Sequence, residues 1–268
     1  MKGFKHPKRK TALITGAASG LGFELSLLIA KDAYNLVLID INAEKLLEAK
    51  EYIKKKYPVE ILTLPNDLSK PDAAQAIFND VKDIPIAVLV NNAGFGLFGT
   101  FSNTDWQRES EMLYLHTFTT THLTKLVLKG MLQRNEGMIL NVSSLAAFQP
   151  GPLMAIYYAT KAYILSFSEA LANELKGTGV SLTVLCPGQT KTAFQKKVSS
   201  AAIDAKADFN MACPKRVAKY GYEAMKKGNT IAIPGRFNKF LSVIPRFVPR
   251  NMATAIVRKI QEVNRCSI

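Results

Sequence analysis

The sequence predicts an α/β fold, a doubly wound parallel sheet of about seven strands flanked by helices and followed by a basic C-terminal extension. Two observations carry this prediction. Short apolar runs rich in β-branched residues alternate with longer amphipathic stretches along most of the chain. A glycine-rich turn also follows the first apolar run directly, where a helix is expected to begin.

The strands are predicted from apolar runs that do not alternate with polar residues, as in Leu36 to Ile39 and Ile86 to Val90. Such runs are typical of strands buried on both faces of a parallel sheet. In order, the expected strands are 11–15, 35–40, 60–64, 86–90, 137–143, 179–186 and 229–233. Amphipathic stretches between them predict helices at 20–32, 43–57, 70–82, 104–134, 155–176 and 214–227.

No linker, repeat or low-complexity run divides the chain. We therefore expect a single α/β domain over residues 1–234, which begins with a basic tail at 1–10. A proline-containing extension over 235–268 is expected to act as a lid or arm. The extension interleaves aromatic and aliphatic residues with Lys and Arg. Contact of this segment with anionic lipid is the second interpretation.

The composition is that of a globular protein, with 48% hydrophobic and 21% charged residues. The basic N-terminus is not followed by an apolar run, and no run is long enough to cross a bilayer, so we expect a cytoplasmic protein, peripheral at most at the inner membrane surface. The three cysteines have neither disulfide-framework nor metal-ligand spacing. We expect no metal.

The net charge of +14 lies largely at the two ends of the chain. A solvated basic surface explains it most simply, although polyanions and anionic lipid are also attracted by such a field. No nucleic-acid-binding motif accompanies the charge, so nucleic acid is not an expected partner.

The segment TGAASGLG places three glycines, Gly16, Gly20 and Gly22, between the first strand and the first helix. Glycines here let the backbone approach a pyrophosphate at a helix N-terminus, with Ser19 and Leu21 beside it. An ordinary glycine turn is the competing interpretation. A Rossmann-type dinucleotide site is favoured because a strand precedes the motif and a helix follows it.

Asp40 ends the second predicted strand. A carboxylate at this position accepts hydrogen bonds from ribose hydroxyls and repels a 2′-phosphate, which favours NAD over NADP. A helix cap for the segment starting near Asn42 is the alternative role of Asp40.

Five ordered motifs over roughly residues 10–195 resemble those of the short-chain dehydrogenase/reductase family: TGAASGLG, NNAG from Asn91, Ser144, YYATK from Tyr157, and PGQTKT from Pro187. The segment from Asn141 to Leu175 further resembles a bacterial subgroup of uncharacterised oxidoreductases in that family. The resemblance implies an NAD(P)-dependent enzyme acting on a carbonyl or alcohol, assembled as a homodimer or homotetramer.

The resemblance also assigns cofactor contacts. It implies that Asp67, with Leu68 beside it, binds the adenine edge, and that Asn91, Ala93 and Gly94 pack against the adenosine ribose. The residues it places around the nicotinamide are Pro187, Gly188, Thr190 and Thr192.

Tyr157 and Lys161 are four residues apart on a predicted helix and therefore share one face. A free phenol titrates near pH ~10, and a neighbouring ammonium and a nicotinamide ring would favour its ionised form. Tyr157 is thus the expected general acid/base, with Lys161 also holding the nicotinamide ribose. Ser144 would polarise the substrate carbonyl. Tyr158 and Ser143 are competing candidates that lack the required spacing.

His116 stands where several family members place an Asn that holds a relay water. An imidazole can bind water but is bulkier and titrates near neutrality, so we expect either a relay role or simple packing. His6 and His122 have no partners at ligand spacing. Phe95, Phe98, Phe148, Leu153, Met154 and Phe194 are the apolar candidates for a hydrophobic substrate site.

Two further functions stay open at the sequence level. A nucleotide-binding regulator would keep the pocket and lack turnover. A peripheral membrane or polyanion-binding protein would use the same fold as a scaffold. The intact set of Ser144, Tyr157 and Lys161 favours the enzyme.

Overall fold

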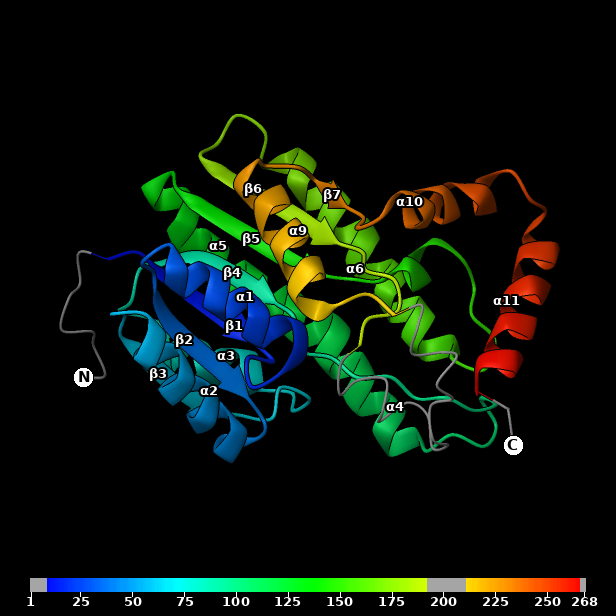
Figure 1. Cartoon of the computed structure of the whole chain (residues 1–268), viewed down its shortest axis with the longest axis horizontal. Helices are drawn as coiled ribbons and strands as arrows, with labels where there is room; N and C mark the ends of the chain where they lie inside the picture. Colours follow the sequence, from blue (N-terminus) through cyan, green and yellow to red (C-terminus); the bar gives the residue numbers. More distant parts are fainter. Residues whose placement is uncertain (1–8, 192–210, 266–268) are drawn as a thin grey trace.

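A computed structural model describes residues 9–191 and 211–265 of the chain. Within them, seven parallel strands form one sheet in the order β3-β2-β1-β4-β5-β6-β7 (Figure 1). The strands are β1 (Thr11–Thr15), β2 (Asn35–Asp40), β3 (Ile61–Pro65), β4 (Ile86–Asn91), β5 (Gly137–Val142), β6 (Val180–Leu185) and β7 (Ile231–Ala232). The predicted doubly wound fold is confirmed.

Helices cover both faces of the sheet because successive strand residues point to opposite sides. Leu36 and Leu38 pack in one core with α1 (Gly20–Lys31), α2 (Ala43–Lys56) and α9 (Pro214–Lys226). Val37 and Ile39 pack in the other core with α3 (Ala73–Val81), α5 (Thr120–Arg134) and the end of α6 (Ala155–Glu174). The alternation explains why these strands are apolar throughout.

The strand order reverses beside β1, whose neighbours are β2 on one side and β4 on the other. At such a switch point the loops after adjacent strands diverge and leave a crevice at the carboxyl edge of the sheet. The loops after β1 and β4 carry the glycine motif and the NNAG segment, so both lie at that crevice.

The predicted helix at 104–134 is three segments: α4 (Trp106–Leu113), a π-helical turn η1 (Tyr114–Thr119) and α5. Threonine hydroxyls support the wider turn, because Thr117 donates to the carbonyl of Leu113 and Thr120 donates to that of Leu115. Periodicity alone does not reveal a single π turn. The predicted last strand is also shorter, with two residues in β7.

The C-terminal segment forms α10 (Arg236–Val243), a 3-10 turn η3 (Ile244–Arg246) and α11 (Arg250–Arg265). These helices lie beyond the carboxyl ends of the strands (Figure 1). In the described residues, no helix is both long and apolar enough to span a membrane.

Candidate functional site

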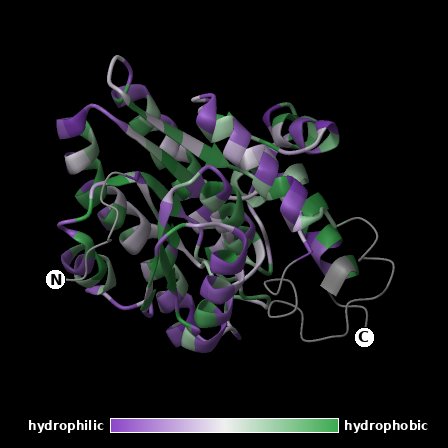
Figure 2. Cartoon of the chain, turned by 60° about the vertical axis from the view of Figure 1, so that its left-hand side comes forward, coloured by the Kyte–Doolittle hydropathy of each residue, from purple (hydrophilic) through white to green (hydrophobic). Residues whose placement is uncertain are grey.

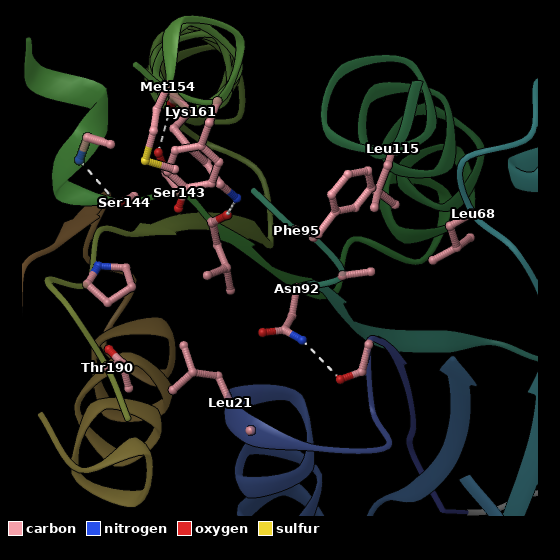
Figure 3. Close-up of a pocket in the computed structure, with 18 of the residues that line it drawn as sticks. Leu21, Leu68, Asn92, Phe95, Leu115, Ser143, Ser144, Met154, Lys161 and Thr190 are labelled. Carbon is pink, nitrogen blue, oxygen red and sulfur yellow. Dashed lines mark hydrogen bonds between the residues drawn. The ribbon is translucent and has the colours of Figure 1, made fainter. Parts of the chain in front are cut away.

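A cavity of about 520 Å³ opens at the carboxyl edge of the sheet (Figure 3). Its walls come from the loops after β1 to β6, from α6 and from α11. Predicted site residues that line it are Gly16, Ser19, Gly20, Leu21, Asp40, Asp67, Leu68, Ala93, Gly94, Ser144, Tyr157, Lys161, Pro187, Gly188 and Thr190. Segments far apart in sequence therefore meet at one cavity.

Six predicted residues in the described part of the chain do not line this cavity. They are Gly22, Asn91 and His116, together with Phe98, Phe148 and Leu153 of the predicted substrate site. Thr192 lies outside the described residues, as does Phe194 of the predicted substrate site.

The glycine turn has the backbone conformation that the motif predicts. Gly16 and Gly20 have φ angles of +65° and +58°, a region that favours glycine. A Cβ on Gly22 would stand 2.0 Å from the carbonyl oxygen of Gly16, so only glycine allows α1 to start this close to β1. The side chain of Ser19 makes no capping bond, which leaves the first N–H groups of α1 directed at the cavity.

The two asparagines at the end of β4 have different hydrogen-bond partners. Asn91 is buried, and its amide donates to Thr124 and Asn141 at 2.9 and 2.8 Å. Asn92 faces the cavity and donates to the carbonyls of Thr15 and Gly16 at 2.9 and 3.1 Å, tying this loop to the glycine turn (Figure 3). Sequence reasoning missed Asn92, although strand alternation predicts opposite directions for the pair.

Asp40 is bound to backbone on both oxygens. One oxygen accepts from the N–H of Ala18 in the glycine turn and the other from the N–H of Asn42, each at 3.0 Å. The cap of α2 is Asn42 itself, whose side chain accepts from Lys45. A carboxylate has about four acceptor positions, so Asp40 retains capacity for further donors.

The carboxylate of Asp67 is hydrogen-bonded to Ser69. Its carboxylate accepts from both the N–H and the hydroxyl of Ser69, at 3.0 and 2.6 Å. Burial alone would raise the pKa of Asp67, but these bonds and the charge of Lys70 outweigh burial, so the pKa lies below its ordinary value. An ionised acceptor thus stands at the cavity wall.

The two serines after β5 differ in their hydrogen-bond partners. Ser143 is buried and donates to the backbone carbonyl of Lys161 at 2.7 Å, which fastens α6 to the sheet. Ser144 accepts from the N–H of Ala146 at 3.1 Å (Figure 3). That contact leaves the hydroxyl hydrogen of Ser144 available to a molecule in the cavity.

Lys161 is a buried cation beside Tyr157. Its Nζ donates to the carbonyl of Val142 at 3.0 Å and lies 5.7 Å from the ring centroid of Tyr157. Burial lowers the pKa of Lys161 to about 8. The ammonium form therefore still predominates at neutral pH, next to the phenol.

His116 is completely buried and has a partner on each ring nitrogen. Nε2 accepts from the N–H of Phe95 at 3.3 Å, and Nδ1 lies 2.9 Å from the hydroxyl of Thr160. That hydroxyl donates to the carbonyl of Tyr157, so Nδ1 is the donor to Thr160. Burial, and then the charge of Lys161, holds the pKa of His116 well below its ordinary value. The imidazole is neutral and packed.

The rest of the wall combines apolar and polar side chains. Phe95, Leu115 and Met154 line it (Figure 3), and the guanidinium of Arg108 lies 4.4 Å from the ring centroid of Phe95. Gln261 of α11 also reaches the cavity and donates to the hydroxyl of Tyr158 at 2.6 Å. Sequence reasoning missed both Arg108 and Gln261.

Within residues 9–191 and 211–265, no three His, Cys, Asp or Glu side chains lie close enough together to hold a metal ion.

The chain is similar to known oxidoreductases. The family model described as short chain dehydrogenase matches residues 10–203. Ketoacyl reductase HetN of Nostoc sp. is 31% identical over 229 residues, which cover 84% of this chain and 78% of that protein. The 17-beta-hydroxysteroid dehydrogenase type 3 of Rattus norvegicus is 33% identical over 74% of this chain and 65% of its own length, slightly less than two thirds.

Solved structures agree with the fold. A structure from a study of 7beta-hydroxysteroid dehydrogenase stereoselectivity has a TM-score of 0.85 and 25% identity, covering 92% of this chain and 96% of that one. A short-chain dehydrogenase from Sphingobium yanoikuyae in complex with NADPH has a TM-score of 0.79 and 27% identity, covering 89% and 90%.

Proposed function

Because the chain belongs to the short-chain dehydrogenase/reductase family of oxidoreductases, we propose that it transfers a hydride between NAD(H) and a hydrophobic carbonyl or alcohol substrate, with Tyr157 as the general acid/base. The observation that carries the proposal is the convergence of Ser144, Tyr157 and Lys161 on the cavity that also contains the glycine turn.

The cavity fits a dinucleotide. The positive φ angles of Gly16 and Gly20 and the open N–H groups of α1 suit a pyrophosphate at a helix N-terminus. Asp40 and Asp67 provide acceptors for the adenosine half. When bound, the nicotinamide supplies the hydride chemistry, and the residues of this chain bind, orient and move protons.

Tyr157 exchanges the proton. In the reductive direction, its phenol donates to the oxygen that becomes the alcohol, and the cation of Lys161 stabilises the phenolate that remains. In the oxidative direction, the phenolate accepts the same proton. The partial exposure of Tyr157 at the cavity wall allows contact with a substrate, whereas Lys161 lines the same cavity but is largely buried.

Ser144 orients the substrate. Its oxygen already accepts from Ala146, so its hydrogen is directed to the carbonyl oxygen of the substrate and stabilises the charge developing there. Ser143 cannot take this role, because its hydrogen is committed to the carbonyl of Lys161.

The preference for NAD is carried by Asp40. Its carboxylate stands at the cavity, where it favours ribose hydroxyls and repels a 2′-phosphate. We expect NAD⁺ to bind more tightly than NADP⁺ and Asp40→Ala to reduce the difference, as measured by cofactor titration. Equal affinities of the unaltered protein for NAD⁺ and NADP⁺ would contradict the proposed preference for NAD.

The substrate class is a bulky, hydrophobic ketone or its alcohol. Phe95, Leu115 and Met154 give the cavity an apolar wall. The names of two similar proteins, a ketoacyl reductase and a 17-beta-hydroxysteroid dehydrogenase, are consistent with this substrate class. We further propose a homodimer or homotetramer built through α4, α5 and α6, which light scattering would detect.

The deciding experiment replaces Tyr157 by Phe. We expect turnover of a ketone panel to fall by about 10²- to 10⁴-fold, because the proton donor is gone, while the affinity for NADH stays nearly unchanged. Retained activity would remove Tyr157 from its role. Tight NADH binding without turnover by the unaltered protein on any ketone would instead indicate a nucleotide-binding regulator.

A further inference from the structure

The helix α11 has two different apolar faces. One face is buried against the rest of the molecule, through the apolar Ala253 and Val257 and the polar Gln261. The adjacent face is exposed, and at spacings of four, four and three residues it presents Met252, Ile256, Ile260 and Val263. Val263 is 73% exposed and the others are about half exposed. Docking of the helix on the fold therefore leaves an apolar stripe in solvent.

The segment before α11 continues this pattern. The exposed apolar residues of α10 and the turn after it are Phe237, Phe240, Leu241, Val243 and Phe247. Phe247 is 82% exposed, the most of any large apolar side chain in the described residues. These nine residues of α10 to α11 are called the C-terminal apolar surface below. In Figure 2 the helices nearest the C-terminus show hydrophobic and hydrophilic residues side by side.

Positive charge surrounds this surface. Between residues 235 and 263 the only carboxylate is Glu262, and Arg258 donates to it at 2.9 Å. The same segment carries six exposed cations: Arg236, Lys239, Arg246, Arg250, Arg258 and Lys259. Exposed apolar side chains flanked by Lys and Arg are typical of helices that lie in a lipid interface.

We propose that the C-terminal apolar surface docks on an anionic lipid bilayer, with its apolar side chains below the headgroups and its cations against the lipid phosphates. A second copy of this chain is the rival occupant. Charge argues against it, because a two-fold interface on this surface would bring two sets of six cations together, whereas anionic lipid neutralises them.

A groove of about 700 Å³ lies beside this surface, between α6 and the start of α11. Its walls are mostly apolar, and Arg246 and Arg250 stand at its α11 side. The groove shares Tyr158 and Gln149 with the main cavity. A hydrophobic molecule leaving the bilayer would therefore meet an apolar path that ends at the wall of the candidate active site.

The test is flotation of the full chain with vesicles of phosphatidylcholine alone and of phosphatidylcholine mixed with phosphatidylglycerol. We expect binding to the mixed vesicles that weakens with added salt. Arg246→Gln combined with Lys259→Gln should weaken binding about fivefold for each charge removed. Phe240→Ser combined with Phe247→Ser should also weaken it, and because all four residues are exposed, folding is expected to survive.

The matched controls are Leu47→Ser and Lys55→Gln, exposed positions on α2 that should bind vesicles like the unaltered chain. Absence of the unaltered chain from the floated mixed vesicles would overturn the proposal, and so would full binding by both altered pairs. If instead the altered pairs convert a dimer into a monomer in light scattering and no form floats, the surface joins two copies of the chain.

Discussion

At the residue scale, the burial of Lys161 is a cost to the folded protein. Burial lowers its pKa from 10.5 to about 8, so the folded state releases a proton at a pH where the unfolded chain still holds it. The unfolded state therefore binds more protons between these two values, and stability gains with rising pH in that window. Below about pH 8 the penalty is present in full.

Replacement of Lys161 by Met should reveal this cost. We expect the free energy of unfolding of the variant, relative to that of the unaltered protein, to fall by about 3 kcal/mol between about pH 7 and 10.5, since only the unaltered protein gains stability there. Denaturant titrations without cofactor measure it. Lys55→Met, at an exposed position, is the control that should show no such trend. A relative stability independent of pH would contradict the burial argument.

His116 is a positioning residue by its contacts. It is hydrogen-bonded to the N–H of Phe95 and the hydroxyl of Thr160, and it does not line the cavity. We expect His116→Asn to keep turnover within an order of magnitude but to lower the free energy of unfolding by about 1–3 kcal/mol, because buried partners lose their bonds. The exposed His122→Asn should change neither. A hundredfold loss of kcat, about the effect of a catalytic acid or base, would show a chemical role for His116.

At the element scale, the motifs and their spacing predicted about half of the residues that line the cavity. The glycine turn, Asp40, Ser144, Tyr157 and Lys161 stand within or next to regular elements, so local pattern places them at the carboxyl edge of a parallel sheet. The contribution of α11 could not be predicted in this way. Gln261 meets Tyr158 across 103 residues of sequence, and no local periodicity encodes that contact.

The division of the chain at residue 235 into a domain and a C-terminal extension stays a prediction. The contacts of α11 suggest a test of whether the extension is held on the domain. Val257 packs in a buried cluster with Ala146, Met154 and Tyr158, next to the partly buried Tyr157. Val257→Lys would place a charge in that cluster, which costs several kcal/mol unless α11 detaches.

We therefore expect Val257→Lys to increase proteolysis of the C-terminal segment and to raise KM for a hydrophobic ketone, with little change in the affinity for NADH. The control is Ile256→Lys, one residue away on the exposed face, which should leave both properties unchanged in the absence of lipid. Equal behaviour of the two variants would show that α11 is not held through Val257.

At the scale of the whole molecule, side-chain hydrogen bonds connect the C-terminal end of α1 to α9. Asp32, just after α1, accepts from the hydroxyl of Tyr222 and from the ammonium of Lys226, both on α9, at 2.8 and 2.7 Å. The bond from Lys226 is the largest influence on Asp32 and lowers its pKa. These hydrogen bonds connect α1 and α9, which cover the same face of the sheet, across a sequence separation of 190 residues.

The contacts of Asp32 with Tyr222 and Lys226 should stabilise the folded protein at pH values above the ordinary pKa of a carboxyl group. This stabilisation should be lost as the pH falls through the lowered pKa of Asp32. We expect Asp32→Asn to lower the free energy of unfolding by about 1 kcal/mol near neutral pH, a modest value because solvent screens this half-exposed pair. The difference should disappear once the pH has fallen below the lowered pKa of Asp32, where its carboxyl is protonated in both states. Asp83→Asn, an exposed carboxyl on another loop, is the control. Equal stabilities of Asp32→Asn and the unaltered protein at neutral pH would show that α1 and α9 are held by their apolar contacts alone.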